Sequence, residues 1–235
     1  KAYLRFGGRQ AIEAAACVLF TAKAERDKAL QVCRPKRSEI VYWPLADEDF
    51  AIARDKPARE RIRGKLGIPP AARVLLFFGR LDPMKRPLEM IEALAASETD
   101  GHLILVGNEF GVTVEDCRKR AEVLGIAERV HAVGPVYGSA KADYFSAADA
   151  YISLSKRENF NFTAAESMAA GLPLILSPGN DLGGELHEAD CAWILQDDTA
   201  ATAAESICNF IGTPGEALEA MGRAGRLWAE SHLRY

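Results

Sequence analysis

The stretch SKRENFNFTAAESMAAGLPLI, residues 155–175, predicts the fold of this chain more directly than any other segment. We expect a strand to end where it begins, a short polar loop to follow, and a helix to run to about Gly171 before Pro173 leads into another strand. Two carboxylates flank the start of that helix, with Glu158 in the loop and Glu166 in the first turns. A junction of this kind faces ligands in an open α/β sheet.

From residue 72 onward, short runs rich in leucine or β-branched residues alternate with helix-like segments, which is typical of βαβ units and a parallel sheet. Strands are expected at 73–78, 102–106, 130–133, 150–154, 174–176 and 192–195. Helices are expected at 86–96, 113–124, 141–147, 163–170 and 200–211. The fold class is therefore α/β, with one doubly wound, Rossmann-like parallel sheet.

The chain before residue 72 is expected to contain one βα unit and further helix-like and extended segments, with strands at 17–21 and 40–43. Such a unit buries too little apolar surface to fold alone, so it should pair with a further domain or dock on the doubly wound one. We divide the chain at the sequence level into four parts: a flanking segment at 1–39, a linker at 40–71, the doubly wound domain at 72–212, and a terminal helix at 213–235.

Composition excludes several classes of protein. The 235 residues are 49% apolar, yet no apolar run is long enough to cross a bilayer, and Lys1 opens no secretion signal, so we expect a cytoplasmic protein. The chain begins without Met, which suggests a piece of something longer. Five cysteines without a C-x-x-C pair predict neither a disulfide framework nor a metal site. His102 and His131 enter expected strands, so we interpret them as structural.

The net charge of −4 argues against a dedicated nucleic-acid binder. The charge is uneven, because residues 1–65 carry 15 basic against 9 acidic side chains and residues 66–235 carry 14 against 24. A basic N-terminal segment could face a second domain or an anionic inner membrane surface as a peripheral contact. We favour the simpler interpretation of a solvated helical surface.

The segment Gly79-Arg-Leu-Asp-Pro-Met-Lys85 follows the first strand of the doubly wound unit, at the edge where such sheets bind ligands. Gly79 permits close backbone approach, Arg80 offers a planar fork for phosphate oxygens, and Lys85 adds a compact second charge. This pair of cations could neutralise a diphosphate without a metal. Taken alone, the pattern fits equally well with ordinary exposed loop charges.

The two glutamates have different interpretations. Thr163 and Glu166 fit a capping box, in which Thr163 caps the helix and Glu166 reaches back, and on its own this structural interpretation is favoured. Glu158 lies outside the helix, so it is either a solvated loop acid or a functional group. A helix start attracts anions, and a carboxylate beside it can accept hydrogen bonds from vicinal sugar hydroxyls.

The GRLDPMK segment, together with the spacing E-x7-E from Glu158 to Glu166 running into SMAAGLPLI, resembles the C-terminal, donor-binding domain of retaining glycosyltransferases of family 4, which have the GT-B fold. The resemblance covers roughly residues 40–211, in matching order. It implies that 1–39 is the end of an N-terminal acceptor domain that this chain otherwise lacks. It also implies that 213–235 is the helix that crosses back to that domain.

The resemblance implies particular roles. Arg80 and Lys85 would hold the donor diphosphate and stabilise the charge that grows on it, and Glu158 would sit by the donor sugar, so these three are the expected catalytic residues. Glu166 would accept hydrogen bonds from ribose hydroxyls, and the loop at 134–137 would border the nucleobase. Donor binding is thereby assigned to Gly79, Val136, Asn159, Phe160, Asn161, Phe162, Thr163 and Glu166.

Two departures from the family pattern carry further expectations. Asn159 and Asn161 stand where Gly-Phe-Gly is usual; asparagine tolerates left-handed backbone, and its side chains would narrow or decorate the sugar pocket. The nucleotide sugar that relatives use therefore does not identify the donor of this chain. After Lys85, Arg86 replaces the usual glycine and would add a cation near the phosphates, while Pro87 suits the first helical turn.

The predicted function is a retaining glycosyltransferase that moves a sugar from a nucleoside diphosphate sugar to an unknown acceptor hydroxyl. We expect it to be independent of metal, since Arg80 and Lys85 could neutralise the diphosphate, and to need no cofactor, since the nucleotide sugar is itself the donor substrate. A nucleotide-sugar epimerase of GT-B architecture and a non-catalytic nucleotide-binding module remain alternatives. A dinucleotide oxidoreductase is disfavoured, because the first strand leads into GRLDPMK rather than G-x-G-x-x-G.

Overall fold

The computed structural model describes residues 7–52 and 55–234. Lys1 and Tyr235, on which expectations fell, lie outside these residues. Six strands form one parallel sheet in the order β5-β4-β3-β6-β7-β8, which confirms the predicted fold class. They are β3 (Val74–Phe78), β4 (His102–Val106), β5 (Val130–Gly134), β6 (Ala150–Ser153), β7 (Leu174–Leu176) and β8 (Ala192–Ile194).

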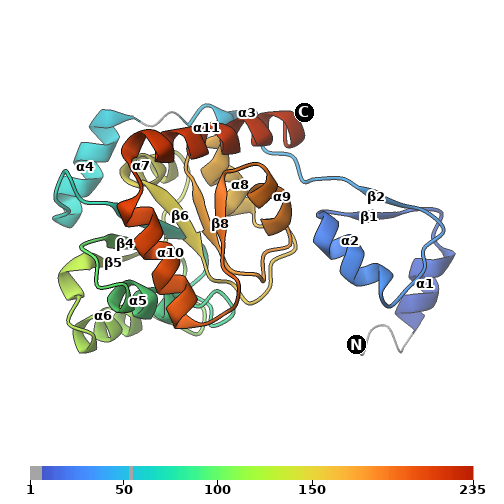
Figure 1. The fold of residues 1–235 in the computed structure, drawn as a ribbon, viewed down its shortest axis with the longest axis horizontal. Coiled ribbons are helices and arrows are strands. Elements are labelled where there is room, and N and C mark those ends of the chain that lie inside the picture. The colour runs from blue at the N-terminus through green and yellow to red at the C-terminus, as the bar shows by residue number, and fades with distance from the viewer. Residues whose placement is uncertain (1–6, 53–54, 235) are drawn as a thin grey trace.

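Helices cover both faces of this sheet (Figure 1). Each lies within a few residues of its expected position where one was expected, with Pro87 opening α5 as predicted. The helices of this part of the chain are α3 (Asp47–Phe50), α4 (Lys56–Leu66), α5 (Pro87–Ala96), α6 (Val114–Val123), α7 (Ala140–Ala147), α8 (Phe162–Ala169), α9 (Gly183–Glu188), α10 (Ala200–Gly212) and α11 (Gly215–His232). A short 3₁₀ helix, η2 (Ala127–Arg129), precedes β5. Both α3 and α4 fall within the range expected to be a linker.

The core follows from the two-residue period of the strands. Along β3, Leu75 and Phe77 point to the face covered by α5, α6 and α10, where they join one apolar cluster. Val74 and Leu76 point to the opposite face and pack with residues of α4 and α7. The strand sequences are apolar at consecutive positions because the sheet is buried on both faces.

The strand order places a topological switch point between β3 and β6, because the chain winds outward in one direction from β3 and in the other from β6. The segments that follow these two strands begin with Gly79 and Leu154. They carry the two motifs that the sequence singled out. The fold therefore brings together, at the carboxyl ends of the strands, segments about 75 residues apart in sequence.

Close backbone contact fixes the first of these segments. The amide of Gly79 donates to the carbonyl of Val106 at 2.9 Å, and Gly107 directly follows that neighbouring strand. A Cβ atom on Gly107 would lie 1.6 Å from the carbonyl oxygen of Gly79, so no other residue fits there without moving backbone. The loop after β3 is thus held against the end of β4.

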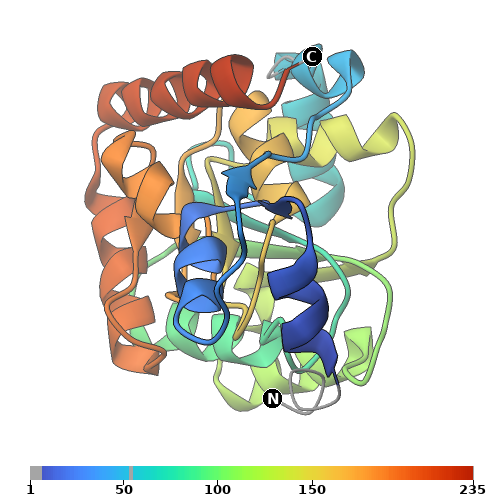
Figure 2. The same ribbon diagram turned by 90° about the vertical axis from the view of Figure 1, so that its right-hand side faces the viewer.

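The N-terminal segment, defined here as residues 7–44, stands to one side of the six-stranded sheet (Figures 1 and 2). It contains α1 (Arg9–Ala14), α2 (Lys23–Leu30), and a separate two-stranded parallel sheet of β1 (Val18–Phe20) and β2 (Ser38–Ile40). The second strand begins two residues earlier than expected and does not extend to Trp43. Leu19 is 63% exposed and Trp43 53%, so apolar surface remains uncovered here.

No helix among the described residues is both long enough and apolar enough to span a membrane.

His102 and His131 lie on the strands β4 and β5, as predicted, and are in contact with each other. Their rings stack with centroids 5.4 Å apart, and Nδ1 of His102 lies 3.1 Å from Nε2 of His131. Burial, and then the neighbouring His102, lower the pKa of His131 from 6.5 to about 4. The folded protein therefore holds this ring neutral under conditions in which the unfolded chain would protonate it.

We expect the free energy of unfolding to fall as the pH drops from about 6.5 to 4, since a depressed histidine pKa gives stability that is present above the unfolded value and lost below it. After allowance for solvent screening of a half-buried ring, the His131 contribution is about 1–2 kcal/mol. Denaturant unfolding of wild type and His131→Gln at several pH values measures it. His187→Gln, an exposed site, should keep the wild-type slope, and an unchanged slope in His131→Gln would contradict the assignment.

Candidate functional site

A cavity of about 200 Å³ lies at the switch point between β3 and β6. It contains eight of the residues that the sequence nominated, together with four that it did not. The lining residues are Phe77, Phe78, Gly79, Arg80, Lys85, Tyr151, Ser153, Glu158, Phe160, Asn161, Phe162 and Thr163. The two sequence motifs therefore form the walls of one cavity.

Asp82 shapes the loop between β3 and α5. The residue is only 8% exposed, and its carboxylate accepts a hydrogen bond from the backbone amide of Met84 at 2.8 Å. Its carbonyl accepts from the amide of Lys85 at 2.7 Å, so the loop turns back on itself. Arg80 projects from this turn with its side chain 57% exposed and its guanidinium 4.8 Å from the ring centroid of Phe110. The turn presents Arg80 and Lys85 together, as the sequence predicted.

Lys85 and Glu158 form an ion pair across the cavity. Glu158 also accepts from the hydroxyl of Ser155 at 3.0 Å, and its side chain is only 13% exposed. Burial, and then the positive charge of Arg80, lower the pKa of Lys85, whereas Asp82 acts in the opposite direction. The site thus joins the largely buried pair of Lys85 and Glu158, whose charges water screens poorly, to the more exposed cation of Arg80.

The capping box predicted for Thr163 and Glu166 is wrong. Helix α8 begins one residue earlier, and Asn161 is its cap, with its side-chain oxygen accepting from the amide of Ala164 at 3.1 Å. The Asn161 amide group donates to Asn180 at 2.9 Å and to Ser153 at 3.2 Å. Asparagine is as good a cap as threonine, and these buried partners favour it.

The expectations for Asn159 and Arg86 need correction. Neither Asn159 nor Asn161 has a positive φ, and the amide of Asn159 donates to Glu25 at 2.7 Å rather than lining the cavity. The left-handed backbone occurs instead at Arg86, with φ 61°, which explains why a glycine would suit that position. The Arg86 side chain pairs with Glu89 and Asp198, so its charge is already engaged away from the cavity.

Glu166 lies on α8, one turn after the cavity residue Thr163; it is not among the residues that line the cavity, and it forms an ion pair with Lys141 of α7. Sequence reasoning missed Lys141, because only the packing of α7 reveals the contact. The ammonium group of Lys141 also lies 5.1 Å from the ring centroid of Phe78, a cavity residue. Burial raises the pKa of Glu166, and the hydrogen bond from Lys141 opposes that shift. Lys141 therefore helps to keep a partly buried carboxylate ionised.

Val136 is the nominated residue that lies farthest along the sheet edge, in the loop after β5. It is partly buried against the apolar cluster of α4 and α7 and does not line the cavity. The neighbouring Tyr137 is 70% exposed, and its hydroxyl donates to Asn108 at 2.6 Å. This loop borders the site rather than entering it.

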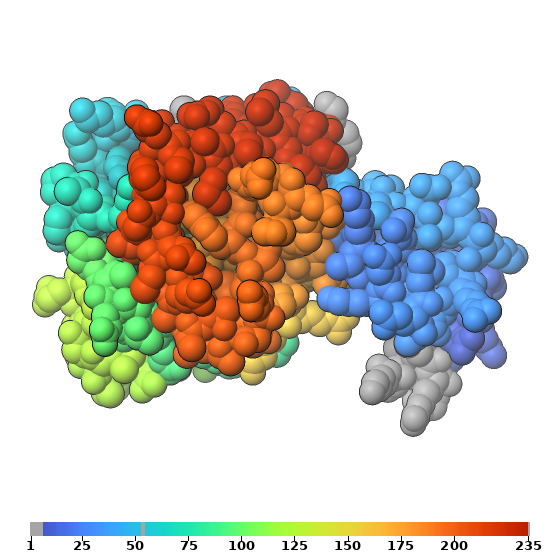
Figure 3. All heavy atoms as spheres, in the orientation of Figure 1, coloured from blue at the N-terminus to red at the C-terminus, as the bar shows by residue number. Residues whose placement is uncertain are grey.

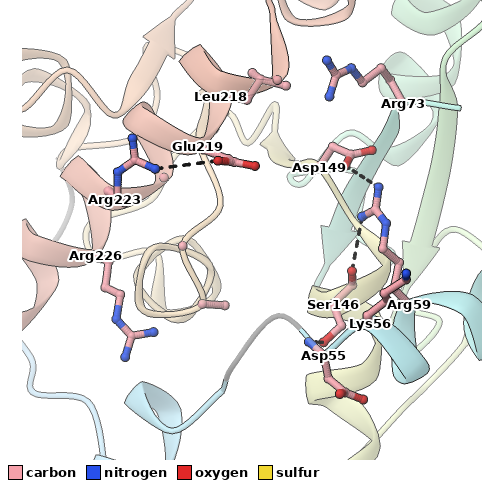
Figure 4. A pocket seen from close by; sticks show the side chains of 14 residues that line it. Asp55, Lys56, Arg59, Arg73, Ser146, Asp149, Leu218, Glu219, Arg223 and Arg226 are labelled. Carbon is pink, nitrogen blue, oxygen red and sulfur yellow. Dashed lines mark hydrogen bonds and ion pairs between the residues drawn. The ribbon is translucent and has the colours of Figure 1, made fainter. Parts of the chain in front are cut away.

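A larger cavity, of about 720 Å³, lies at the opposite edge of the sheet, beside the residues that precede β3 and β6 (Figure 4). Its charged side chains are engaged with one another or with backbone. Arg59 donates to Asp149 at 2.7 Å, Arg223 lies 3.8 Å from Glu219, and Arg73 donates to the carbonyl of Thr213 at 3.1 Å. Ligands of doubly wound sheets bind at the carboxyl edge, so we assign the smaller cavity as the candidate site.

Residues 58–228 match the family model described as Glycosyl transferases group 1. The chain belongs to this family. A D-inositol 3-phosphate glycosyltransferase of Streptomyces avermitilis is 30% identical over 238 residues, covering 95% of this chain and 50% of the relative. The protein of the same name from Streptomyces scabiei is 31% identical over 225 residues, covering 87% and 50%. The chain thus spans about half the length of these curated relatives.

Solved structures of other proteins share the fold. Anabaena Alr3699/HepE in complex with UDP-glucose gives a TM-score of 0.82 at 20% identity, covering 99% of this chain and 64% of that one. The sucrose-phosphate synthase of Thermosynechococcus elongatus gives 0.83 at 21% identity, covering 100% and 58%. At these identities the likeness establishes the GT-B type of architecture and leaves the chemistry to be argued from the site.

Proposed function

We propose that this chain is the donor-binding half of a retaining glycosyltransferase of family 4, which moves a sugar from a nucleoside diphosphate sugar to an acceptor hydroxyl. The observation that carries the proposal is the joining of Arg80, Lys85 and Glu158 around one cavity at the switch point. Two cations can bind a diphosphate, and the neighbouring carboxylate can accept hydrogen bonds from hydroxyl groups, so the site suits a ligand that carries both.

In this proposal each residue has a distinct role. Arg80 and Lys85 bind the diphosphate and stabilise the negative charge that develops as the bond to the sugar breaks. Glu158 accepts hydrogen bonds from the transferred sugar, and Glu166 from the ribose. Phe162 and Thr163, at the start of α8, line the same cavity, and the backbone amides of this first turn would orient hydroxyl or phosphate oxygens. Gly79 lets the ligand approach the backbone closely.

The whole protein is proposed to contain an acceptor domain of which 1–39 is the end, with 40–71 connecting it to the donor domain at 72–212 and 213–235 crossing back. The uncovered side chains of Leu19 and Trp43 support this, because a missing domain would bury them. Relatives named for D-inositol 3-phosphate make a phosphorylated polyol one acceptor to try. The acceptor site itself would lie mainly outside this chain.

Calorimetric titration of the 235-residue chain tests donor binding. We expect UDP, the nucleotide bound by a structural neighbour, to bind at least about tenfold more tightly than UMP, because only the diphosphate reaches both Arg80 and Lys85. GDP and ADP, titrated in parallel, report the choice of base. Equal affinity for UDP and UMP would contradict the assigned diphosphate site.

Turnover distinguishes the remaining alternatives. Full-length protein incubated with UDP-glucose and acceptor should release UDP and form a glycoside with retained anomeric configuration. An epimerase would instead alter the nucleotide sugar without any acceptor, and a non-catalytic module would bind UDP without turnover. Either of these outcomes would replace the proposed reaction while leaving the nucleotide site in place.

A further inference from the structure

The loop that carries Glu158 is contacted from outside the donor site by α2 of the N-terminal segment. Glu25 of α2 accepts from the side-chain amide of Asn159 at 2.7 Å. The same carboxylate accepts from the amide and hydroxyl of Thr21 at 2.7 and 2.9 Å. Glu25 is therefore held in place by its own segment before it meets the loop.

A second contact comes from the same face of α2. Lys28 lies three residues after Glu25, so the two side chains project from one side of the helix. Lys28 forms an ion pair with Asp181, whose side chain is only 6% exposed. A buried acid of this kind requires a partner, because leaving its charge unpaired is costly.

Both contacts lead directly to Glu158. Asn159 is its neighbour in the chain, and the amide of Asp181 donates to the carbonyl of Glu158 at 2.9 Å. The amide of Glu158 in turn donates to the carbonyl of Gly179 at 2.8 Å. A Cβ atom on Gly179 would lie 2.4 Å from the carbonyl of Ser155, so the segments after β6 and β7 are too close to move independently.

The contact surface fits a coupling role. In the space-filling view the N-terminal segment meets the rest of the molecule along one side only (Figure 3). Further hydrogen bonds anchor it there, because Glu185 accepts from the amide of Lys23 at 3.1 Å and from the hydroxyl of Tyr42 at 3.0 Å. The contact through Glu25 differs from this anchor in that it ends on the loop of Glu158, and the contact through Lys28 ends on Asp181, whose amide is hydrogen-bonded to that loop.

We propose that α2 acts as a clamp on that loop: Glu25 holds Asn159 and Lys28 holds Asp181, and together they set the position of Glu158 toward the transferred sugar. Asn159, which replaces a glycine of the family pattern, thereby acts as a positioning residue. The proposal rests on the proposed function for its consequence, and for its geometry on the contacts that lead from Glu25 and Lys28 through Asn159 and Asp181 to Glu158. Movement of the N-terminal segment would change directly how Glu158 holds the sugar, and would affect the diphosphate contacts only through the ion pair of Glu158 with Lys85.

Nucleotide affinities of clamp variants test the proposal. The double variant Asn159→Gly/Lys28→Met in the 235-residue chain should bind UDP-glucose about tenfold more weakly than wild type but UDP within about twofold, because the sugar would contact Glu158 directly, whereas the diphosphate meets it only through the ion pair with Lys85. Lys23→Met on the same helix is the matched control: it keeps the backbone contact with Glu185 and removes only a side-chain pair with Glu188 of α9 at 3.9 Å, away from the Glu158 loop, so both affinities should stay unchanged. Equal losses for UDP and UDP-glucose, or no loss for either, would overturn the clamp.

Hydrogen exchange gives a readout that needs no nucleotide. The double variant should exchange the amides of Glu158 and Asp181 about tenfold faster, while the amides of β3 and β6 keep their wild-type rates. Unchanged exchange at Glu158 and Asp181 would overturn the clamp even if the nucleotide assignment holds. Failure of the wild-type chain to bind UDP would overturn the proposed function, and the exchange rates would still decide the clamp.

Discussion

Replacement of Lys85 by methionine is expected to lower kcat for glycosyl transfer by about 10²–10³-fold, the usual effect of removing one preorganised donor from a developing negative charge. Methionine keeps most of the apolar stem and removes the ammonium group that pairs with Glu158 in a cavity shielded from solvent. UDP release by full-length protein with saturating UDP-glucose and acceptor measures the change. The loss should fall on kcat more than on KM, since the charge grows mainly in the transition state.

Lys156→Met is the matched control for this measurement. Lys156 lies two residues before Glu158 in the same loop, but it is exposed, and no ion pair joins it to any residue within the described ranges. Its substitution should leave kcat within about twofold of wild type. A wild-type kcat in Lys85→Met would remove Lys85 from the chemistry and would leave Arg80 as the sole charge candidate for the leaving group.

The sheet and its ligand-facing edge could be predicted from sequence because both depend on local patterns. Apolar runs of five residues or fewer, separated by helix-like text, specify buried parallel strands, and the structure bears out all six. Once β3 and β6 are adjacent, the carboxyl-end rule alone brings Arg80, Lys85 and Glu158 to one edge. Their meeting in a single cavity is a consequence of topology.

The contacts that tune the site could not be predicted, because each depends on distant side chains. Thr163 and Asn161 are both acceptable caps by type, and only the buried partners Ser153 and Asn180 decide between them. Lys141 of α7 forms an ion pair with Glu166 of α8, and the sequence around neither residue indicates this contact. The interaction of Asn159 with Glu25 joins residues 134 positions apart, and sequence reasoning had placed that side chain in the sugar pocket.

Glu166→Ala is expected to weaken UDP binding by about 10- to 100-fold, because the ribose hydroxyls would lose a charged hydrogen-bond acceptor in a poorly solvated place. Calorimetric titration of the chain measures this. Burial raises the pKa of Glu166, so as the pH is lowered this carboxylate should become protonated earlier than an ordinary glutamate. The affinity of the wild type for UDP should therefore begin to fall at a higher pH than an ordinary glutamate would cause. Lys141→Met removes the group that opposes that shift, and the fall should move to still higher pH.

The 2′,3′-dideoxy analogue of UDP separates this role from a merely structural one. If Glu166 accepts from the ribose hydroxyls, then Glu166→Ala should cost little for the dideoxy analogue, because the partners are already absent from the ligand. If Glu166 only stabilises α8 through its pair with Lys141, the substitution should weaken both ligands equally. Arg80→Gln provides the contrast, since a diphosphate contact should be lost to the same extent with either nucleotide. Equal losses of both ligands in Glu166→Ala would therefore contradict the ribose assignment and leave the diphosphate grip intact.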